Sequence, residues 1–420
     1  MVRATLLGGL GRAINALVAL FVLGLLARHL ALDELGRFAL FAFLLTLLDQ
    51  VTDFGTGNLT LQRGSNDDWA FTSYLTGARR LRTRAFLVGW CIAALAVLAV
   101  RPSEPGWFLL ALASPATRRF EASALALQRR VEWGRPVAIR SGAALLRAAL
   151  VALLVARGVT TAGPFLVAIA ATNSLAHVAL HLAARGRLPR PSIAVALPRD
   201  LLRAALPLAV VGVVQLLHVQ IDHALVGALA GSEELARYHV AARVFSYLVW
   251  VPVLATQAAL PVLARAHARG ELGARLERYG LPTALVGALA LGALWPHAAT
   301  LLGLAFDEPF RASAPALRAL LVAAVVVWIQ AWWISALVAS DRGRALFVAT
   351  LAALAVNVAG NVLLIGRFGG EGAAWATAVS ELVSGLAAYI VLVRAGDLRP
   401  RALLLALAAA PLFWLARTLA

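Results

Sequence analysis

The chain has 420 residues, of which 61% are hydrophobic and only 14% are charged. A soluble domain carries roughly 25% charged residues, so this composition excludes an ordinary soluble fold. The net charge is +17 and every basic residue is an arginine, but the arginines are scattered through short loops and apolar segments, which excludes a nucleic-acid-binding domain. The single cysteine, Cys91, lies in an apolar run. It leaves neither a disulfide framework nor a thiolate metal site.

The chain divides into apolar segments of the length that crosses a bilayer, which is about 20 residues per helix. Helices are predicted because lipid offers the backbone no hydrogen-bond partners, and no alternating pattern indicates a barrel. The first segment is longer than a signal-peptide core and contains Arg12, so we interpret it as a retained span. An all-α polytopic membrane protein is therefore predicted, with thirteen helices near residues 4–27, 38–60, 85–100, 107–128, 136–156, 163–184, 204–229, 236–264, 279–302, 314–338, 345–366, 371–393 and 401–419.

The arginines also predict the orientation of the chain. With a cytoplasmic N-terminus, about 24 arginines fall in cytoplasmic segments, about 8 in outer segments and about 6 within spans, a strong positive-inside bias. One cytoplasmic loop is predicted to contain Arg79, Arg80, Arg82 and Arg84. Another, 185–203, is the expected connector between two halves of the protein.

A short charged hexamer occurs twice in the chain. Residues 33–38, DELGRF, align without a gap with residues 233–238, EELARY, 200 residues later. Each hexamer falls between the first two helices of a six-helix set, so we predict two parallel repeats related by an axis along the membrane normal. The predicted lobes are 1–199 and 200–395, with one extra C-terminal span in 396–420. The alternative is that the hexamer recurs by chance.

Ionisable groups inside spans cost a few kcal/mol and normally face a cavity or a partner. Depth within adjacent spans pairs Arg12 with Asp53 and Asp222 with Arg243, and these could be structural ion pairs that join neighbouring helices. The other polar side chains within spans include Asp49, Arg118, Arg119, Glu121, Arg140, Arg147, Asn173, His177, His181, Gln215, His218 and His239.

Subtracting the possible pairs leaves a surplus of arginine near Glu121. Such a cluster needs a hydrated cavity or a bound anion, and arginine suits phosphate because its planar fork donates two parallel hydrogen bonds. We therefore predict a central cationic cavity for a phosphorylated amphiphile. Its predicted substrate-binding residues are Arg118, Arg119, Arg140, Arg147 and Arg243. Alternatively, Arg118 and Arg119 extend to the membrane surface or pair with Glu121.

Ion coupling or gating is predicted for several acidic and histidine side chains. His177, His181 and His218 titrate near neutral pH and could couple movement of a substrate to protons, or they could be neutral and hydrogen-bonded to a neighbouring helix. Asp53 or Asp222 could instead join a sodium site. The chain contains no glycine-rich phosphate loop, paired-metal carboxylate cluster or nucleophile motif. We expect no catalytic site, cofactor or bound metal, because the longest loop has only about 24 residues, too few for a catalytic domain outside the membrane.

Motifs in the same order along the chain resemble those of a known family. LDELGRFALF and LLDQVTDFGTGN resemble the start of polysaccharide flippases, which belong to the multidrug/oligosaccharidyl-lipid/polysaccharide exporter superfamily. In the second half, LPLAVVGVVQLLHVQIDHALVG, ARYHVAARVFSYLVWVPVLATQAALPVLAR and LLIGRFGGEGAAWATAVSELV resemble the seventh span, the eighth span and the loop before the twelfth. The chain departs from the family pattern at Arg37-Phe38 and in its single extra C-terminal span.

The resemblance implies two six-helix lobes around a central cavity in the bacterial cytoplasmic membrane. It implies transfer of a polyprenyl-diphosphate-linked oligosaccharide to the outer leaflet for cell-surface polysaccharide such as O-antigen of lipopolysaccharide. Asp53, Asp222 and Arg243 match charged positions typical of the family. The expected partners are this substrate, membrane lipid, a coupling ion that is either H⁺ or Na⁺, and the polysaccharide polymerase or glycosyltransferases that act on the same carrier. The alternatives are a drug/ion antiporter on the same scaffold and a membrane-embedded sugar polymerase or ligase.

Overall fold

The computed structural model describes residues 2–64, 67–100, 102, 104–188, 198 and 200–399. Within these ranges every regular element is a helix, and nine helices are long and apolar enough to cross a membrane, or ten if one bent pair forms a single span. The prediction of an all-α, multi-pass membrane protein is confirmed. The predicted span at 401–419 lies outside the described residues.

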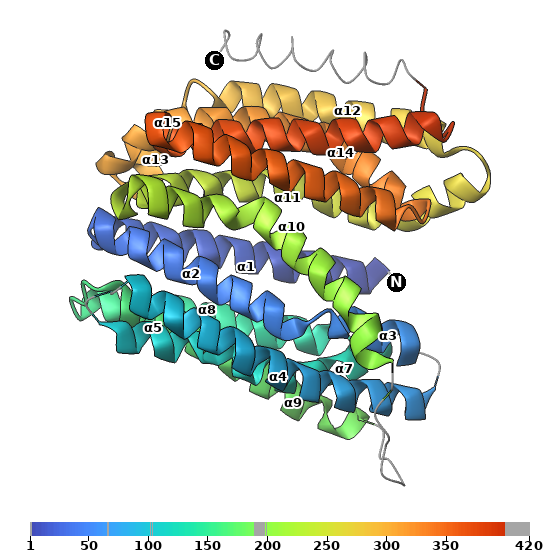
Figure 1. Ribbon diagram of the computed structural model, residues 1–420, viewed down its shortest axis with the longest axis horizontal. Helices are drawn as coiled ribbons and strands as arrows, with labels where there is room; N and C mark the ends of the chain where they lie inside the picture. The colour runs from blue at the N-terminus through green and yellow to red at the C-terminus, as the bar shows by residue number, and fades with distance from the viewer. Residues whose placement is uncertain are drawn as a thin grey trace. The chain divides into compact units, whose positions relative to one another are not determined.

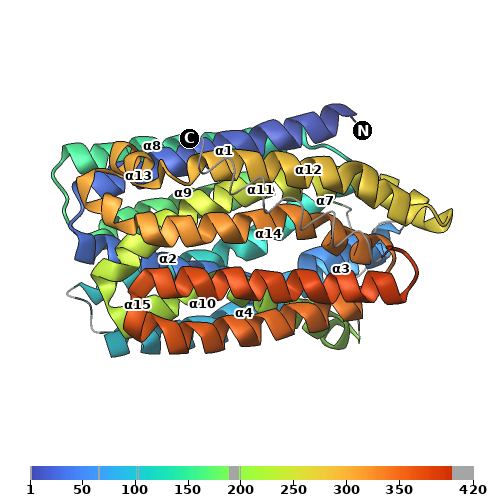
Figure 2. The same cartoon turned by 90° about the horizontal axis from the view of Figure 1, so that it is seen from above.

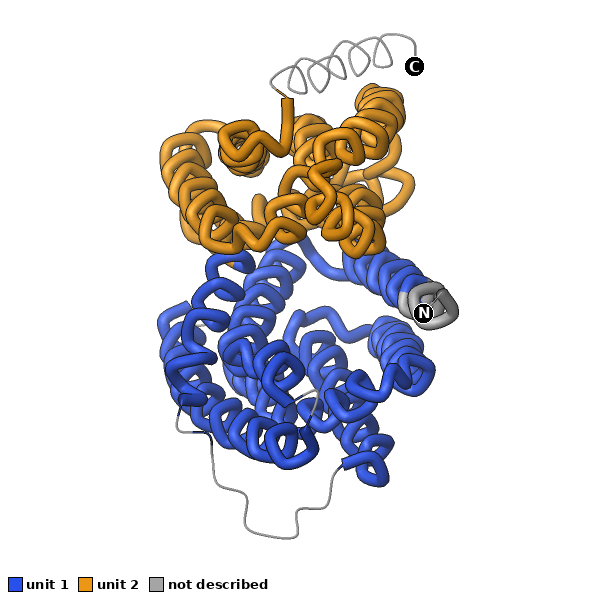
Figure 3. The backbone as a smooth tube through the Cα atoms, turned by 90° about the vertical axis from the view of Figure 1, so that its right-hand side faces the viewer, with its two compact units in different colours: residues 1–216 blue, residues 217–420 orange. Residues whose placement is uncertain are grey.

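The chain forms two compact units, residues 1–216 and 217–420, so the division falls inside α10, Leu201–Ala230 (Figure 3). The lobe boundary at 199/200 and the extra span stay predictions. In unit 1, α1 packs on α8, α8 on α9, and α2 on α4 (Figure 1). The helices of unit 1 that precede α10 are α1 (Val2–His29), α2 (Leu32–Asp53), α3 (Thr56–Gly64), α4 (Asp68–Val100), α5 (Pro105–Leu112), α6 (Arg118–Glu121), α7 (Leu125–Arg129), α8 (Gly134–Ala156) and α9 (Ala162–Ala184).

Two predicted segments of unit 1 differ from the structure in instructive ways. The segment predicted at 85–100 is the end of α4, which begins at Asp68, so the arginines placed in a loop at 79–84 lie within a helix. The segment predicted at 107–128 is a series of short helices joined by 3₁₀ turns at Ser114–Thr117 and Ala122–Ala124. Pro115 lies in the first turn and has no backbone N–H to donate, which favours an interruption there.

Up to residue 399, where its described residues end, unit 2 contains the second part of α10 and five further α-helices, among which α11, α14 and α15 pack side by side (Figure 2). The long α15 contains the predicted segments 345–366 and 371–393. They are two helices that meet at a kink at Gly369, whose φ of 56° and ψ of −136° are not helical. α12 and α13 form the bent pair, with an angle of 73°. The five helices are α11 (Ser232–Ala268), α12 (Leu272–Leu294), α13 (Ala298–Phe306), α14 (Ala314–Ala339) and α15 (Gly343–Arg394).

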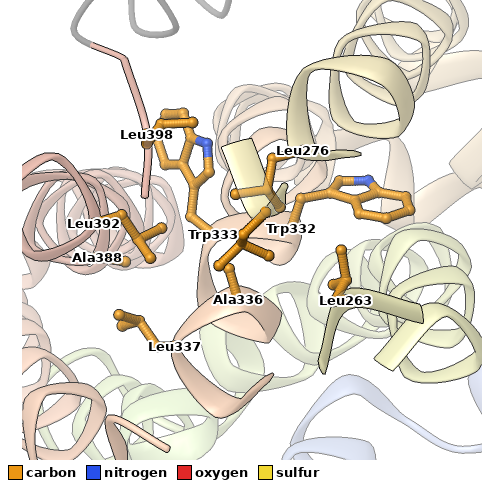
Figure 4. Packing of buried hydrophobic residues seen from close by; sticks show 10 residues of the cluster. Leu263, Leu276, Trp332, Trp333, Ala336, Leu337, Ala388, Leu392 and Leu398 are labelled. Atoms are coloured by element: carbon orange, nitrogen blue, oxygen red, sulfur yellow. The ribbon is translucent and has the colours of Figure 1, made fainter. Parts of the chain in front are cut away.

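The core of unit 2 includes a cluster built around two adjacent tryptophans of α14. Trp332 and Trp333 are buried together with leucines from α11, α12 and α15. Figure 4 shows the Trp333 ring next to Leu398, while the ring of Trp332 points the other way. These side chains pack four segments of unit 2 together, since aromatic rings bury large apolar areas.

The two copies of the charged hexamer make the same contacts in their own units. Each begins a helix, α2 or α11, in which the arginine pairs with both preceding acids: Arg37 with Asp33 and Glu34, and Arg237 with Glu233 and Glu234. The second acid of each copy then accepts a backbone N–H at the start of a distant helix.

In unit 1, Glu34 Oε2 accepts the N–H of Ala162 at 2.8 Å, at the first residue of α9. In unit 2, Glu234 Oε1 accepts the N–H of Gly370 at 2.8 Å, at the first residue after the kink in α15. A carboxylate at a helix N-terminus satisfies an N–H that has no partner within the helix and interacts favourably with the helix dipole. The equivalent contacts indicate that the hexamers are repeats of one structural unit.

Candidate functional site

A buried ion pair lies where α2 ends. Asp53, the last residue of α2, accepts a hydrogen bond from Nη2 of Arg82 on α4, whose side chain is only 3% exposed. Arg82 Nε also donates to Thr56 Oγ1 at 2.9 Å and its Nη1 to the Arg118 carbonyl at 2.9 Å. The partner predicted for Asp53 was Arg12, which is exposed on α1. Asp53 therefore joins α2 to α4, and Arg82 is a functional candidate that the sequence did not indicate.

The break after Asp53 depends on glycine. Phe54 and Gly55 have φ values of 52° and 66°, which interrupt the helix between α2 and α3 within one apolar span, Leu32–Gly64. A methyl group at Gly55 would lie 2.6 Å from Cβ of Leu208 in α10. Gly55 is therefore required both by the left-handed conformation and by the close approach of α10.

Arg118 and Arg140 do not form an uncompensated cationic cluster. Arg118 contacts Asp49 Oδ1 through Nε at 2.9 Å and also pairs with Glu121 Oε2. Arg140 Nη2 donates to Glu121 Oε1 at 2.8 Å. Together with the pair between Arg82 and Asp53, these contacts balance three arginines with three carboxylates. The surplus predicted around Glu121 is therefore wrong for Arg118 and Arg140, because Asp49 and Glu121 reach them.

The histidines of α9 hydrogen-bond to the interrupted segment of short helices. His177 Nδ1 lies 2.8 Å from Thr117 Oγ1, and its Nε2 lies 3.8 Å from Glu121 Oε2. His181 Nδ1 lies 2.7 Å from Ser123 Oγ, which in turn accepts a hydrogen bond from Arg79. These contacts fit the alternative of histidines hydrogen-bonded to a neighbouring element. A role in ion coupling stays a prediction.

Arg119 and Arg147 have neutral partners. The Arg119 guanidinium lies 4.7 Å from the centre of the Phe120 ring. On α8, Arg147 donates to Asn173 Oδ1 at 2.7 Å and to Thr172 Oγ1 at 3.4 Å. Arg147 forms no ion pair within the described residues. Its full positive charge therefore remains inside unit 1.

Unit 2 has its own buried carboxylate at Asp222. Its Oδ2 accepts the Tyr238 hydroxyl, and its Oδ1 lies 3.0 Å from His223 Nδ1. The predicted partner Arg243 instead lines a small cavity with Asp222, Tyr238 and Thr377. Asp222 and Arg243 therefore lie in one region, as their depth within adjacent spans predicts, but Tyr238 and His223 supply the hydrogen bonds of Asp222.

A second polar group in unit 2 centres on Glu381 in α15. Glu381 Oε1 lies 3.5 Å from Nε2 of His218 on α10, and Glu381 Oε2 accepts a hydrogen bond from Gln330 on α14. His218 was predicted as an ion-coupling residue, but Glu381 was not. The signal was present, because an acid ten residues inside the twelfth predicted span is costly without a partner.

No match was found among curated proteins. The family described as "Polysaccharide biosynthesis protein" matches residues 1–267. Among solved structures, lipid II flippase MurJ in an inward closed conformation has a TM-score of 0.72 and 12% identity, over 97% of this chain and 91% of that chain.

Two further structures have the same fold. A multidrug resistance MATE family transporter of the MOP superfamily in an inward-facing conformation has a TM-score of 0.67 and 15% identity, over 90% of this chain and 93% of that one. A MOP superfamily transporter from Pyrococcus furiosus has a TM-score of 0.67 and 16% identity, over 93% and 94%. The fold is thus that of MOP superfamily transporters. Because the sequence match spans well over half of its residues, this multi-pass membrane protein belongs to the polysaccharide biosynthesis protein family.

Proposed function

We propose that the protein is a flippase that moves a polyprenyl-diphosphate-linked oligosaccharide from the cytoplasmic to the outer leaflet by alternating access, without a chemical step. Membership of the polysaccharide biosynthesis protein family supports the substrate class. The likeness to a lipid II flippase supports the movement of a lipid-linked sugar. The proposal also retains the bacterial cytoplasmic membrane and a cytoplasmic N-terminus, as the arginine distribution predicts.

The observation that carries this proposal is the environment of Arg147. Its guanidinium is half-buried in α8 and held by the neutral oxygens of Asn173 and Thr172. A cation without a carboxylate partner inside an apolar bundle is costly, and a bound anion relieves that cost. Two of its five N–H donors are used, so others remain for a diphosphate, which guanidinium binds through paired hydrogen bonds.

Arg118 and Arg140 have a different role in this proposal. Both are engaged by Glu121, and Arg118 also by Asp49. We assign them to the structural framework that positions the interrupted segment, together with Arg82. Arg119 and Arg243, which have no carboxylate partner among the described contacts, stay candidates for binding the substrate headgroup.

The test is reconstitution of the full chain in liposomes with a fluorescently labelled polyprenyl-diphosphate sugar. Access of a membrane-impermeant quencher reports the leaflet of the label. We expect Arg147→Ala to reduce the initial rate at least about tenfold, the factor that corresponds to one lost interaction of about 1.4 kcal/mol. Arg147→Lys keeps the charge but not the paired donors, so its initial rate should lie between those of the wild type and Arg147→Ala.

The matched control is Arg275→Ala, which removes an arginine of α12 that is one-third exposed and pairs with Glu271 at the start of that helix, and it should leave the rate unchanged. Wild-type movement that is unaffected by Arg147→Ala would remove Arg147 from the site. No movement of the labelled lipid under any imposed ion gradient would contradict the proposed function itself.

A drug/ion antiporter is the second candidate, supported by the likeness to MATE transporters. A cationic drug requires a negatively charged binding site. The candidate acids in unit 2 are Asp222 and Glu381, which lie within α10 and α15. Both already accept hydrogen bonds, and Arg147 and Arg243 add positive charge within the two units, so we favour the anionic substrate. A sugar polymerase or ligase is not favoured, because no connection between the helices that the structure describes, from α1 to α15, is long enough to carry a catalytic domain.

A further inference from the structure

The feature that the proposed function does not use is the polar group at Glu381. Glu381 lies eleven residues after Gly370 and thirteen before Arg394, near the middle of the second helix of α15. Eleven residues correspond to about 16 Å of helix, which is half the thickness of a bilayer core. The side chain is 14% exposed. A carboxylate at this depth requires a bound proton or a partner.

The partners of Glu381 are suited to sharing a proton. Oε1 lies 3.5 Å from Nε2 of His218, and Gln330, which is 1% exposed, donates its amide to Oε2. The His218 side chain is 8% exposed, and neither of its ring nitrogens has a hydrogen-bond partner within the described residues. An imidazole that is more than nine-tenths buried and unsatisfied is costly. A proton held between it and Glu381 would remove that cost.

Gly385 lets Gln330 reach the pair. A methyl group at Gly385 would lie 2.8 Å from Gln330 Oε1 and 3.1 Å from its Cβ. The carbonyl oxygen Oε1 of Gln330 is itself buried without a hydrogen-bond partner in the part of the chain that the structure describes. The amide is therefore held in one orientation by packing, with its N–H₂ toward the carboxylate and its oxygen against the helix of Gly385.

Other titratable groups lie on the helices around the pair. On α10, Asp222 is one turn from His218, but both of its oxygens are already engaged by Tyr238 and His223. Among the described residues away from the helix ends, the charged or titratable side chains of α10, α11, α14 and α15 other than the pair are Asp222, His223, Tyr238, His239, Arg243, Tyr247 and Tyr389.

The chemistry of the group favours a proton over a metal cation. Hard cations are held by several oxygen ligands. Glu381 faces an imidazole nitrogen and an amide N–H₂, and so only the carboxylate offers oxygen. Within the described residues, no three His, Cys, Asp or Glu side chains are grouped so that they could hold a metal. The arrangement instead matches an acid and a base that exchange a proton, since imidazole is the side chain that titrates near neutral pH.

We propose that Glu381 and His218 form the proton-binding site that couples this protein to a proton gradient. This inference rests on the proposed transport function, and it names H⁺ as the coupling ion. In the loaded state one proton is shared by the pair. When it moves from Glu381 to His218, the O–H bond at Oε1 breaks and the N–H bond at Nε2 forms, and release from His218 leaves the carboxylate held by Gln330.

The experiment reads protonation of Glu381 without any substrate. The O–H of a protonated carboxyl in an apolar environment adds across a C=N bond of dicyclohexylcarbodiimide. The resulting O-acylisourea rearranges by an O-to-N acyl shift to a stable N-acylurea, which mass spectrometry locates on the chain. For the wild-type protein in detergent we expect labelling at Glu381 at low pH that disappears at high pH. Labelling should be the same in sodium chloride and in choline chloride, and His218→Gln should change its pH dependence.

Glu371 is the matched control, because it lies near the start of the same helix, where its Oε1 accepts a hydrogen bond from the Trp375 indole N–H. Glu371→Gln should leave labelling at Glu381 unchanged. Protection of Glu381 by sodium, or no labelling at any pH, would overturn the proton site. Gly385→Ala keeps both titrating groups and should alter the pH dependence by displacing Gln330, which provides a readout if Glu381→Gln does not fold.

The transport assay adds a separate outcome. In liposomes, Glu381→Gln should abolish stimulation by an imposed pH gradient while movement without a gradient continues. Retained stimulation would contradict the proposal. If the wild-type protein moves no lipid-linked sugar, the proposed function fails, yet the labelling still decides whether Glu381 binds a proton.

Discussion

Breaking the ion pair between Arg82 and Asp53 is the sharpest test of the structural framework in unit 1. Arg82 is 3% exposed and makes three polar contacts, to Asp53, Thr56 and the carbonyl of Arg118. Removing one partner of a buried pair costs about 3–5 kcal/mol, because the other charge is left buried and unpaired. We expect Arg82→Met to lower the free energy of unfolding by about that amount.

Asp53 is the less buried partner, with 23% of its side chain exposed. Asp53→Asn leaves the Arg82 cation with neutral hydrogen-bond partners only. It should lower the free energy of unfolding by about 3 kcal/mol, the lower end of the same range. The double variant removes both charges. It should be more stable than the sum of the two single changes predicts, with a coupling energy of at least about 1 kcal/mol, because neither charge is then left alone.

The assay is unfolding in mixed detergent micelles, followed by the fluorescence of the 11 tryptophans. Arg275→Ala is the control. Arg275 in α12 pairs at 3.4 Å with Glu271, which precedes the helix, and 33% and 48% of the two side chains are exposed. Solvent-accessible pairs of this spacing contribute only about 0.3–0.5 kcal/mol. The structural role of this pair would be refuted if Arg82→Met lowered the free energy of unfolding by less than about 1 kcal/mol. It would also be refuted if the effects of the two single variants simply added in the double variant.

Three further changes are tested in the same micelle assay. Gly55→Ala should cost about 2 kcal/mol or more, because a left-handed residue with a side chain is strained and the new methyl meets Leu208; a neutral effect would contradict the description of this turn. Glu234→Ala removes the charged acceptor of the Gly370 N–H and should cost about 2 kcal/mol, and faster proteolysis near the kink in α15 is the independent readout. Tyr238→Phe leaves Asp222 without its hydroxyl donor and should cost about 1.5–3 kcal/mol, whereas unchanged stability would mean that water replaces the hydroxyl.

The sequence predicted the helices well because the bilayer imposes a length and a composition on every span. It also identified the repeated hexamer, whose contacts through Glu34 and Glu234 the structure shows to be equivalent. Those contacts join residues 128 and 136 positions apart. Hydrophobicity carries no information about such distant pairs, so the reason for the repeat became visible only in the fold.

Which buried charges pair with one another could not be predicted from the sequence. Asp53 was recognised as a buried acid, but depth along the helix selected Arg12 as its partner because depth does not reveal which helices are neighbours. The actual partner, Arg82, was placed in a loop because the polar start of α4 does not look like a membrane helix. Arg82 can lie there because Asp53 neutralises it and Thr56 accepts a hydrogen bond.

The central claim is that the cargo is an anionic lipid-linked sugar, and a direct comparison of cargo classes tests it. Proteoliposomes containing the wild-type chain would be given, in parallel, a labelled polyprenyl-diphosphate oligosaccharide and a fluorescent lipophilic cation, each with and without a proton gradient. We expect leaflet transfer of the lipid-linked sugar and no protein-dependent flux of the cation. Flux of the cation with no transfer of the lipid would contradict it and establish the antiporter instead.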